Sequence, residues 1–560
     1  MRPSHRQLQT FAFEPPDQSD SLVSHHETLV STMASLVLLG ERTARGPCDR
    51  NAPHSLNARS PPRTRRRASP PRLCDSACPR NSPRPPLGYS PITTHNRPSR
   101  PHKSTMAKTP RPHITPIAGP ILGEFLIGIS VAMAGLWMAS EISDAAAGAF
   151  GMANQVMETL FVIFRVLAIG VGVTITQAIG GHQPEAARRT ALVGLGASTW
   201  AGAAAALWVL LGSNWTLDVL NAPDAVMALA EPYLPLLALA LLLEAYNLTM
   251  ASILRAHLRA RDALVVMVLM HTSHVVLAFP LMLGVGGWDG LGLPGYALAL
   301  TISRALGVVL HLRLWRINMK LVPHRRDWWV CPVRALAPVL RIGIPGASLE
   351  LGYRIAFMMS LSAAAKLGVA ALATQAYTLQ TLRYVLLISL AIGWACEIMV
   401  GHLIGAGEFR TAHQLVRKGL RNGLLASGAL ALIAAAAAPW LMRGFTRDPA
   451  IIEMAQTLLW ISFALETGRV ANLVVLGALR STGDVIYPVA ASITSLILVL
   501  GVGSVLLGRE FGLVGIWIAY AADEWIRSAL MYWRWETHGW VAHARAIHQR
   551  IRSPGVESRF

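Results

Sequence analysis

From residue 117 to residue 535 the chain is a succession of apolar runs, rich in Leu, Ala and Val, that do not alternate with polar residues. Each run is about 20 residues long, as a helix needs to cross a bilayer, whereas a barrel strand needs only about 10. Charged residues make up 14% of the chain, against about 25% in soluble proteins. Because lipid offers the backbone no hydrogen-bond partners, the sequence predicts an all-α membrane protein.

The apolar runs number twelve. We expect membrane-spanning helices near 117–141, 145–180, 190–212, 228–255, 263–286, 293–316, 336–362, 367–404, 415–441, 452–479, 485–507 and 512–535. The second and eighth of these windows are too long for a single span, so we expect interfacial turns inside them. Residues 1–105 lack such runs and are rich in Pro and Arg, a composition typical of a disordered extension.

The distribution of positive charge predicts the topology. Lys and Arg gather in the loops that stay in the cytoplasm. Basic residues are frequent in the loops after even-numbered helices, and the loops after odd-numbered helices carry only Lys366, Arg443, Arg447 and Arg509. We therefore expect a multi-pass protein of the plasma membrane (the inner membrane of a bacterium) with both termini in the cytoplasm. The net charge of +19 follows from these loops and a basic N-terminal extension, so we expect no nucleic-acid partner.

The chain also repeats itself. A shift of 225 residues places Pro120 on Pro345 and Gln155 on Gln380, and it places the pair Leu254-Arg255 on Leu479-Arg480. Gly292 and Gly512 correspond at a slightly shorter shift. Six helices per half is an even number, so both halves insert the same way up and are related by an axis along the membrane normal. We predict two homologous six-helix lobes, 106–325 and 326–540, around a central cavity, followed by a cytoplasmic tail at 541–560.

Three stretches resemble the multidrug and toxic compound extrusion family. They are Gln177–Gly181, Val400–Gly407, and Gly477–Asp484 with the downstream Pro488. The resemblance covers about residues 115–535, and it implies an antiporter that expels organic, often cationic, compounds as Na⁺ or H⁺ enters. Family members often carry an Asp in the first helix where this chain has Gly135, so that cation site is not carried over. Glu350 resembles an acidic position seen in part of the family.

Carboxylates inside the helices are the candidates for cation or proton coupling, because an ionisable group in a membrane is costly and usually functional. Glu124 and Glu350 each follow the proline of their half by about one turn, and Glu244 lies in the fourth helix. A structural role is the alternative for each of them. Glu350 can pair with Arg354 one turn later. Glu124 can lie near the interface. Glu244 has Arg469 as its repeat equivalent, and these opposite charges suggest an ion pair, either between the lobes or within one helix.

Aromatic and amide side chains are the candidates for a substrate cavity, since aromatic rings bind flat lipophilic cations. The predicted lining residues are Trp137, Gln155, Tyr353, Gln380 and Trp394. Packing or a place in the interfacial aromatic belt is the alternative for the aromatic ones.

Other polar residues of the helices are expected to have structural roles. Glu158, Arg165, Arg383 and Glu397 can balance one another's charge, and His271 and His274 either pack or relay protons. Arg255 and Arg480 are expected to anchor helix ends at the cytoplasmic surface.

The chain lacks the motifs of an ATP-driven pump or an enzyme. No phosphate-binding glycine loop follows a strand, and no serine or cysteine nucleophile motif is present. We expect no enzyme activity, no cofactor or bound metal beyond a coupling H⁺ or Na⁺, and a monomer that handles small cationic or lipophilic compounds in the bilayer. Two alternatives stay open. One is a lipid-linked saccharide flippase, which a cavity rich in Arg would favour, and the other is an intramembrane enzyme.

Overall fold

The computed structural model describes residues 114–220 and 223–552. All of them belong to the unit that begins at Ser104. The predicted disorder of residues 1–105 lies outside the described residues. Within those described, the secondary structure is helical apart from one isolated bridge between Val285 and Trp288.

The first six spanning helices form the N-lobe. They are α2 (Thr115–Ile142), α3 (Asp144–Gly180), α4 (Pro184–Val219), α5 (Asp224–Ala256), α6 (Ala260–Leu283) and α7 (Leu293–Leu314). Ser143 separates α2 from α3, because its extended backbone ends the first helix and its hydroxyl accepts a hydrogen bond from the Ala146 amide, 3.0 Å away. After α7, a π-helical turn (Trp315–Met319) and the 3₁₀ turn η3 (Arg325–Trp328) lead to the second lobe.

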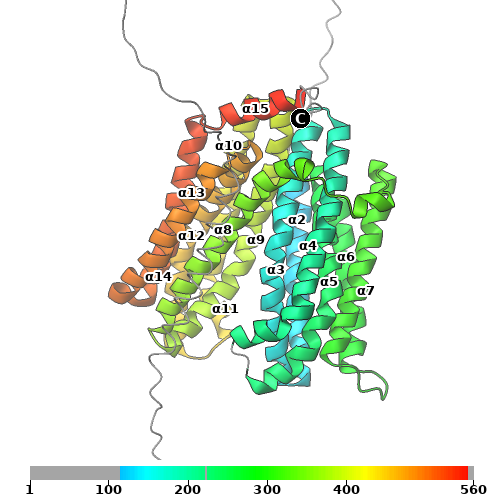
Figure 1. Ribbon diagram of the computed structural model, residues 1–560. Helices are drawn as coiled ribbons and strands as arrows, with labels where there is room; N and C mark the ends of the chain where they lie inside the picture. The colour runs from blue at the N-terminus through cyan, green and yellow to red at the C-terminus, as the bar shows by residue number, and fades with distance from the viewer. Residues whose placement is uncertain (1–113, 221–222, 553–560) are drawn as a thin grey trace, which may run out of the picture. The chain divides into compact units, whose positions relative to one another are not determined.

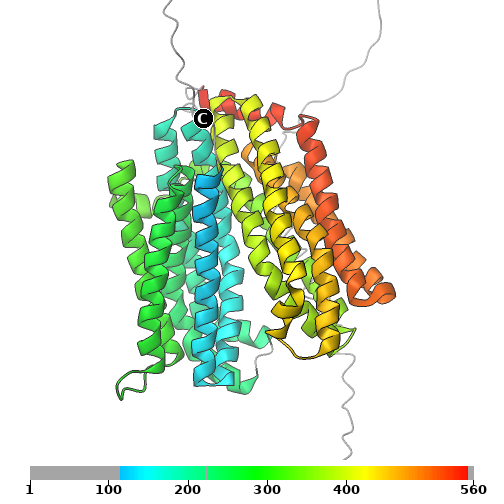
Figure 2. The ribbon, with the colours of Figure 1, turned by 180° about the vertical axis from the view of Figure 1, so that it is seen from behind.

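The C-lobe repeats this arrangement. It contains α8 (Val333–Ala365), α9 (Val369–Ala406), α10 (Phe409–Ala436) with the short α11 (Ala438–Arg443), α12 (Pro449–Ser481), α13 (Ile486–Ser495), the π-helical η4 (Leu496–Val502) and α14 (Gly503–Glu536). Figures 1 and 2 show the two groups of helices side by side, blue to green for the N-lobe and yellow-green to red for the C-lobe.

The twelve predicted spans are confirmed. Ten described helices are long and apolar enough to cross a membrane. One of them, Ile486–Glu536, is two spans joined at Gly512, and α8 is a further helix of 33 residues. Gly292 and Gly512 have the same left-handed backbone, with φ of 63° and 60°, so the repeat extends to the turn before each last helix. The prediction of interfacial turns inside 145–180 and 367–404 was wrong, because α3 and α9 are continuous helices.

The lobes meet through α2 and α3 on one side and α8 and α9 on the other. Gly180 packs against the backbone carbonyl of His402, and Gly405 packs against that of Gln177, with no room for a Cβ at either glycine. Both pairs are related by the shift of 225 residues, so the contact is reciprocal, as a twofold axis requires. The axis therefore passes between the basic ends of α3 and α9. We call the end of the lobes that carries these basic loops the basic side.

The last helix, α15 (Val541–Arg552), covers this contact. It lies across the ends of the bundle in Figure 1. The His548 Nδ1 atom is 2.9 Å from the carbonyl oxygen of Gly405 in the C-lobe, and Ile551 packs against Gly181 in the N-lobe. The segment expected to be a tail therefore forms, through residue 552, a helix that touches both lobes.

Candidate functional site: an ionic cluster between the lobes

Four charged side chains meet where α3 faces α8. Arg165 of α3 binds Glu350 of α8, and its other nitrogen lies 3.1 Å from a carboxylate oxygen of Glu158. Arg354 lies 3.7 Å from Glu350 and 3.8 Å from Glu158, and it donates a hydrogen bond of 3.3 Å to the Glu158 carbonyl oxygen. Two carboxylates and two guanidinium groups, with one of each from either lobe, thus form a neutral cluster.

This interlobe cluster is accessible. The Glu350 side chain is 27% exposed and that of Glu158 is 49% exposed. Arg165 and Arg354 are similarly half-buried. Charged groups at this depth of a membrane protein face the protein interior or water, not lipid. The interlobe cluster is therefore partly exposed and not sealed inside the helix bundle.

Sequence reasoning found Glu350 and missed its principal partner. The predicted pair with Arg354 is present, but the contact with Arg165 of the other lobe is closer. One signal was available. Glu158 and Arg165 lie two turns apart on one face of α3, and Glu350 and Arg354 lie one turn apart on α8, so the two helices carry complementary charge patterns.

Glu124 lies elsewhere, near the basic side. Its carboxylate is buried and accepts a hydrogen bond of 2.6 Å from Arg255. The Arg255 guanidinium lies 5.5 Å from the centre of the Trp394 ring of the C-lobe, which also packs edge-on against Phe125. Glu124 therefore belongs to a buried pair in the lobe contact.

Arg255 and Arg480 do not anchor helix ends at the surface as expected. Arg255 is 6% exposed. Arg480 binds Glu397 through two nitrogens, at 2.7 and 2.5 Å. The two arginines are repeat equivalents, so each lobe buries one guanidinium beside a carboxylate. Of the four residues expected to balance one another's charge, Glu158 and Arg165 do form an ion pair, at 3.1 Å, whereas Glu397 pairs with Arg480.

Glu244 pairs within its own lobe, with Arg304 of α7 at 2.8 Å. Its repeat equivalent Arg469 binds Glu466 at 2.5 Å and Glu524 at 3.2 Å inside the C-lobe. The sequence suggested an ion pair either between the lobes or within one helix. The structure forms the pair within a helix, between Arg469 and Glu466 of α12, and Glu244 does not pair with Arg469.

The five predicted substrate residues are not gathered at one place. Trp137 and Gln155 are exposed, and the Gln380 amide lies 3.9 Å from the Met133 sulfur of α2. Tyr353 stacks on Phe357 against the C-lobe core. Trp394 lies in the lobe contact described above. Of the five, Gln380 and Trp394 contact side chains of the other lobe, and Trp137 and Gln155 are exposed.

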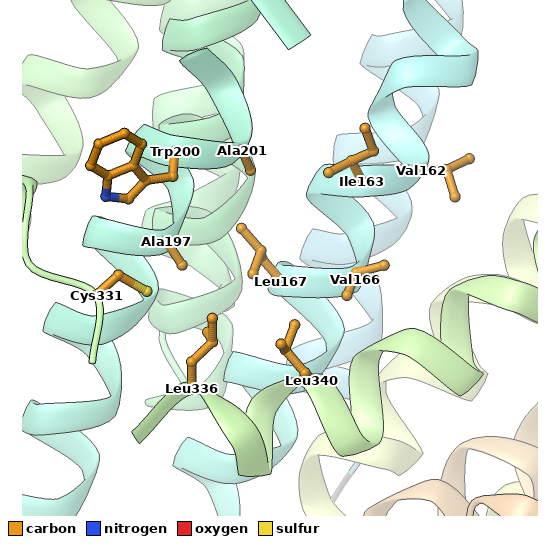
Figure 3. Close-up of a pocket in the computed structure, with 10 residues that line it drawn as sticks. All are labelled: Val162, Ile163, Val166, Leu167, Ala197, Trp200, Ala201, Cys331, Leu336 and Leu340. Carbon is orange, nitrogen blue, oxygen red and sulfur yellow. The ribbon is translucent and has the colours of Figure 1, made fainter. Parts of the chain in front are cut away.

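An apolar crevice of about 330 Å³ lies on another side of the lobe junction, and none of those five residues lines it. Figure 3 shows its walls, which come from α3, α4 and the start of α8. The thiol of Cys331 just before α8 borders it, and burial raises the pKa of this thiol. The lining residues are Val162, Ile163, Val166, Leu167, Ala197, Trp200, Ala201, Cys331, Leu336 and Leu340.

Metal binding finds no support in the described part of the chain. Residues 114–220 and 223–552 contain no group of three or more His, Cys, Asp or Glu side chains placed to hold a metal ion.

Two six-helix lobes related by an axis along the membrane normal, with an accessible ionic cluster between them, define the class of protein as a multi-pass membrane transporter. The MatE family model matches residues 120–280 and 349–505. The chain therefore belongs to the MatE family, the multidrug and toxic compound extrusion transporters that its motifs resemble.

Relatives agree with this assignment. The uncharacterized transporter YisQ of Bacillus subtilis is 29% identical over 79% of this chain and 99% of its own length. The probable multidrug resistance protein NorM of Thermotoga maritima is 24% identical over 80% of this chain and 96% of its own. The crystal structure of the Vibrio cholerae MATE transporter VcmN in the bent form superposes with a TM-score of 0.70 at 18% identity, covering 78% of this chain and 97% of that one. The family assignment does not favour the flippase alternative.

Proposed function

We propose that this protein is a secondary active antiporter that expels small organic compounds, cationic or lipophilic, as H⁺ or Na⁺ enters. Family membership and the names of multidrug resistance relatives support the efflux of organic compounds. The observation that carries the coupling proposal is the contact between Glu350 of one lobe and Arg165 of the other. The charge on this carboxylate affects the attraction between the lobes directly.

The proposed cycle depends on that charge. Ionised Glu350 attracts Arg165, and this attraction favours the arrangement in which α3 and α8 are close. A proton or Na⁺ that neutralises Glu350 removes the attraction. A half-exposed ion pair is worth about 1 kcal/mol or less, and 1.4 kcal/mol changes an equilibrium tenfold. Such a contact can bias alternating access without locking either state.

Glu124 and Glu244 are the further coupling candidates. Each already has an arginine partner, Arg255 and Arg304. A cation can neutralise these carboxylates only at the expense of a buried pair, whose disruption is costly. We therefore assign the principal role to Glu350 and an accessory role to the other two.

Substrate is proposed to bind between the lobes, beside the interlobe cluster. Trp137, Gln155 and Gln380 supply aromatic and amide contacts there, and Tyr353 and Trp394 join them when the lobes rearrange. The basic side is proposed to face the cytoplasm, with both termini, because basic loops are retained there. The membrane is the plasma membrane, and the working unit is one chain.

Efflux from proteoliposomes tests this proposal. Full-length protein is reconstituted, loaded with a fluorescent organic cation, and given a proton or a sodium gradient in turn. The parent is compared with Glu350→Gln and with Glu185→Gln, whose carboxylate is exposed on the basic side. We expect one gradient to drive efflux in the parent and in Glu185→Gln, and Glu350→Gln to lose the dependence on the gradient.

Two results contradict the proposal. If neither gradient drives efflux by a well-folded parent, the antiport function is wrong. If Glu350→Gln transports with unchanged gradient dependence, the coupling site lies elsewhere.

A further inference from the structure

The apolar crevice beside Cys331 has no part in the interlobe cluster or in the proposed transport cycle. Nine of its ten lining side chains are hydrocarbon or indole, and the tenth is the thiol. The Trp200 indole N–H is already donated to the Trp329 carbonyl oxygen, at 3.0 Å. Two lining residues, Ile163 and Trp200, are 44% and 57% exposed. Exposed apolar surface of this kind on a bundle of membrane helices contacts lipid chains.

The crevice is preformed, because the chain before α8 is fixed on α4. The Thr199 hydroxyl donates a hydrogen bond to the carbonyl oxygen of Trp328. Two residues later, the Val330 carbonyl packs against Gly196 with no room for a Cβ. Cys331 follows directly and borders the crevice. A ligand therefore does not have to order this wall, which lowers the cost of binding.

Unpaired arginines flank this segment. Residues 313–341 contain seven Lys and Arg and a single acidic residue, Asp327, whose carboxylate accepts a hydrogen bond of 2.7 Å from the His324 amide. Arg326 and Arg334 lie before and after the segment that borders the crevice, and both are exposed. Within the part of the chain that the structure describes, neither guanidinium has a hydrogen-bond or ion-pair partner. The rim of the crevice thus carries positive charge that no carboxylate balances.

The length of α8 places these arginines at the level of the lipid headgroups. Lys366 ends α8 on the opposite face, and Arg334 precedes it by 32 residues, about 48 Å at 1.5 Å per residue. A bilayer is about 40–45 Å thick with its headgroups, and α8 is inclined to its neighbours (Figure 1). Arg334 therefore lies among the headgroups on the basic side. Leu336 and Leu340, which line the crevice, lie beside the adjoining ends of the acyl chains.

A second apolar crevice, of about 490 Å³, shows what distinguishes the first. It lies within the N-lobe, between α4, α5 and α7. Glu231 lies four residues before Pro235, one of its lining residues. The arginine nearest to its walls in sequence, Arg304, is already paired with Glu244 at 2.8 Å. Of these two crevices, the one beside Cys331 is therefore the one suited to an anionic lipid.

We propose that the crevice beside Cys331 binds one anionic phospholipid from the leaflet on the basic side. An acyl chain fills the crevice, and Arg326 and Arg334 bind the phosphate, because a guanidinium donates two parallel hydrogen bonds to phosphate oxygens. Basic pockets between membrane helices are typical sites for acidic headgroups. The walls come from both lobes, so the bound lipid favours the arrangement in which α8 packs on α3. This lipid is a resident ligand of the membrane-facing surface, and its binding is independent of the proposed transport.

Alkylation of Cys331 by N-ethylmaleimide measures the occupancy of the crevice. Cys331 is half-buried, whereas Cys396 is buried, and peptide mass spectrometry separates Cys331 from the other cysteines. Full-length protein in detergent is titrated with dioleoylphosphatidylglycerol, dioleoylphosphatidylcholine or glycerol 3-phosphate. We expect phosphatidylglycerol to halve the alkylation rate at about a tenth of the concentration that phosphatidylcholine needs, the size of a charge-assisted hydrogen bond. Glycerol 3-phosphate, a headgroup without chains, should leave the rate unchanged.

Two kinds of variant separate the headgroup from the chain, with each rate compared to that of the same protein without lipid. The double variant Arg326→Gln/Arg334→Gln should need about tenfold more phosphatidylglycerol and the same amount of phosphatidylcholine. Ile163→Trp, which narrows the crevice, should weaken protection by both lipids alike. Leu210→Trp, in the second crevice, and Arg447→Gln, in an exposed loop, are the matched controls and should behave as the parent.

Other outcomes overturn the proposal. If both lipids protect Cys331 equally in the parent, the crevice accepts any chain and has no headgroup site. If the double arginine variant keeps the preference for phosphatidylglycerol, the phosphate is bound elsewhere, and if Arg447→Gln loses it too, the preference reflects net charge. Protection by glycerol 3-phosphate alone would mean a phosphate site without a chain. The two arginines are exposed, so the double variant tests the proposal even where Ile163→Trp does not fold.

Discussion

The two lobes bury the same ion pair with its charges exchanged. In the N-lobe, Glu244 of α5 pairs with Arg304 of α7 at 2.8 Å. At the equivalent positions of the C-lobe, Arg469 of α12 pairs with Glu524 of α14 at 3.2 Å. An asparagine lies one turn on in each lobe: Asn472 donates a hydrogen bond of 3.0 Å to the Glu524 carboxylate, and Asn247 donates one of 3.0 Å to the backbone carbonyl of Arg304. The repeat thus keeps a buried pair between the same two helices and does not keep its polarity.

The charged residues around the pair differ between the two lobes. The C-lobe adds Glu466, Asp523 and Arg527, all buried, so its cluster holds three carboxylates and two guanidinium groups. The N-lobe pair has no surplus charge, and buried His271 and His274 lie in the same lobe. The C-lobe cluster thus has one more carboxylate than guanidinium groups, and each of its two arginines contacts two carboxylates.

The largest effect is expected when an arginine that contacts two carboxylates is removed. Arg469→Gln leaves three carboxylates with Arg527 alone, whereas Arg304→Gln leaves only Glu244 unpaired. Breaking a buried pair lowers the free energy of unfolding by about 3–5 kcal/mol. We expect the loss for Arg469→Gln to lie near the upper end of this range and the loss for Arg304→Gln to lie near its lower end. Glu466→Gln, which removes the surplus charge, should change stability by less than about 1 kcal/mol.

Chemical unfolding in detergent micelles measures these differences. Equal losses of unfolding free energy for Arg469→Gln and Arg304→Gln would show that the additional carboxylate of the C-lobe has no energetic consequence. A large loss for Glu466→Gln would show that this carboxylate is needed and not in excess.

Exchanging the charges of the N-lobe is the next test. The double variant Glu244→Arg/Arg304→Glu gives the N-lobe pair the polarity of the C-lobe pair. If the repeat requires an ion pair at these positions but not a particular polarity, the double variant should lose less unfolding free energy than the two single variants added together. The expected difference is about 1–3 kcal/mol. The measurement is a double-mutant cycle from unfolding midpoints, and additive losses would contradict it.

Much of this arrangement follows from sequence, and the limits have a physical cause. The hydropathy and the repeat predicted the twelve helices and the equivalence of Glu244 and Arg469. Their opposite charges suggested that the two residues pair, but the pseudo-twofold axis puts them in separate lobes, and each finds a partner inside its own lobe. Similarly, the pair of Glu350 with Arg354 follows from helical spacing. The contact of Glu350 with Arg165 depends on how the lobes meet, and the complementary charges on α3 and α8 do not by themselves place these two helices together.

Reciprocal contacts between the lobes give a third test, of smaller size. Gly180→Ala and Gly405→Ala each place a methyl group against the backbone of the other lobe. Overpacking of this kind costs about 1–3 kcal/mol, and we expect both variants to separate the lobes at the basic side to the same extent. Gly151→Ala, on α3 with open space around it, is the control.

Spin labels at residues 185 and 410, which are repeat equivalents exposed on the basic side, report this separation as a distance distribution. A longer distance in only one of the two glycine variants would mean that the contact is not symmetric.

The smallest effect is expected at α15, which belongs to the C-terminal half and reaches the N-lobe through Ile551. Ile551→Ser removes a half-buried aliphatic contact with Gly181, worth about 1 kcal/mol or less, and keeps the contact of His548 with Gly405. We expect the same pair of labels to show a modest increase of the longer distances, and Ala542→Ser, on the exposed side of α15, to show none. An unchanged distribution would mean that the symmetric contact between the lobes holds the basic side closed without the helix that lies across it.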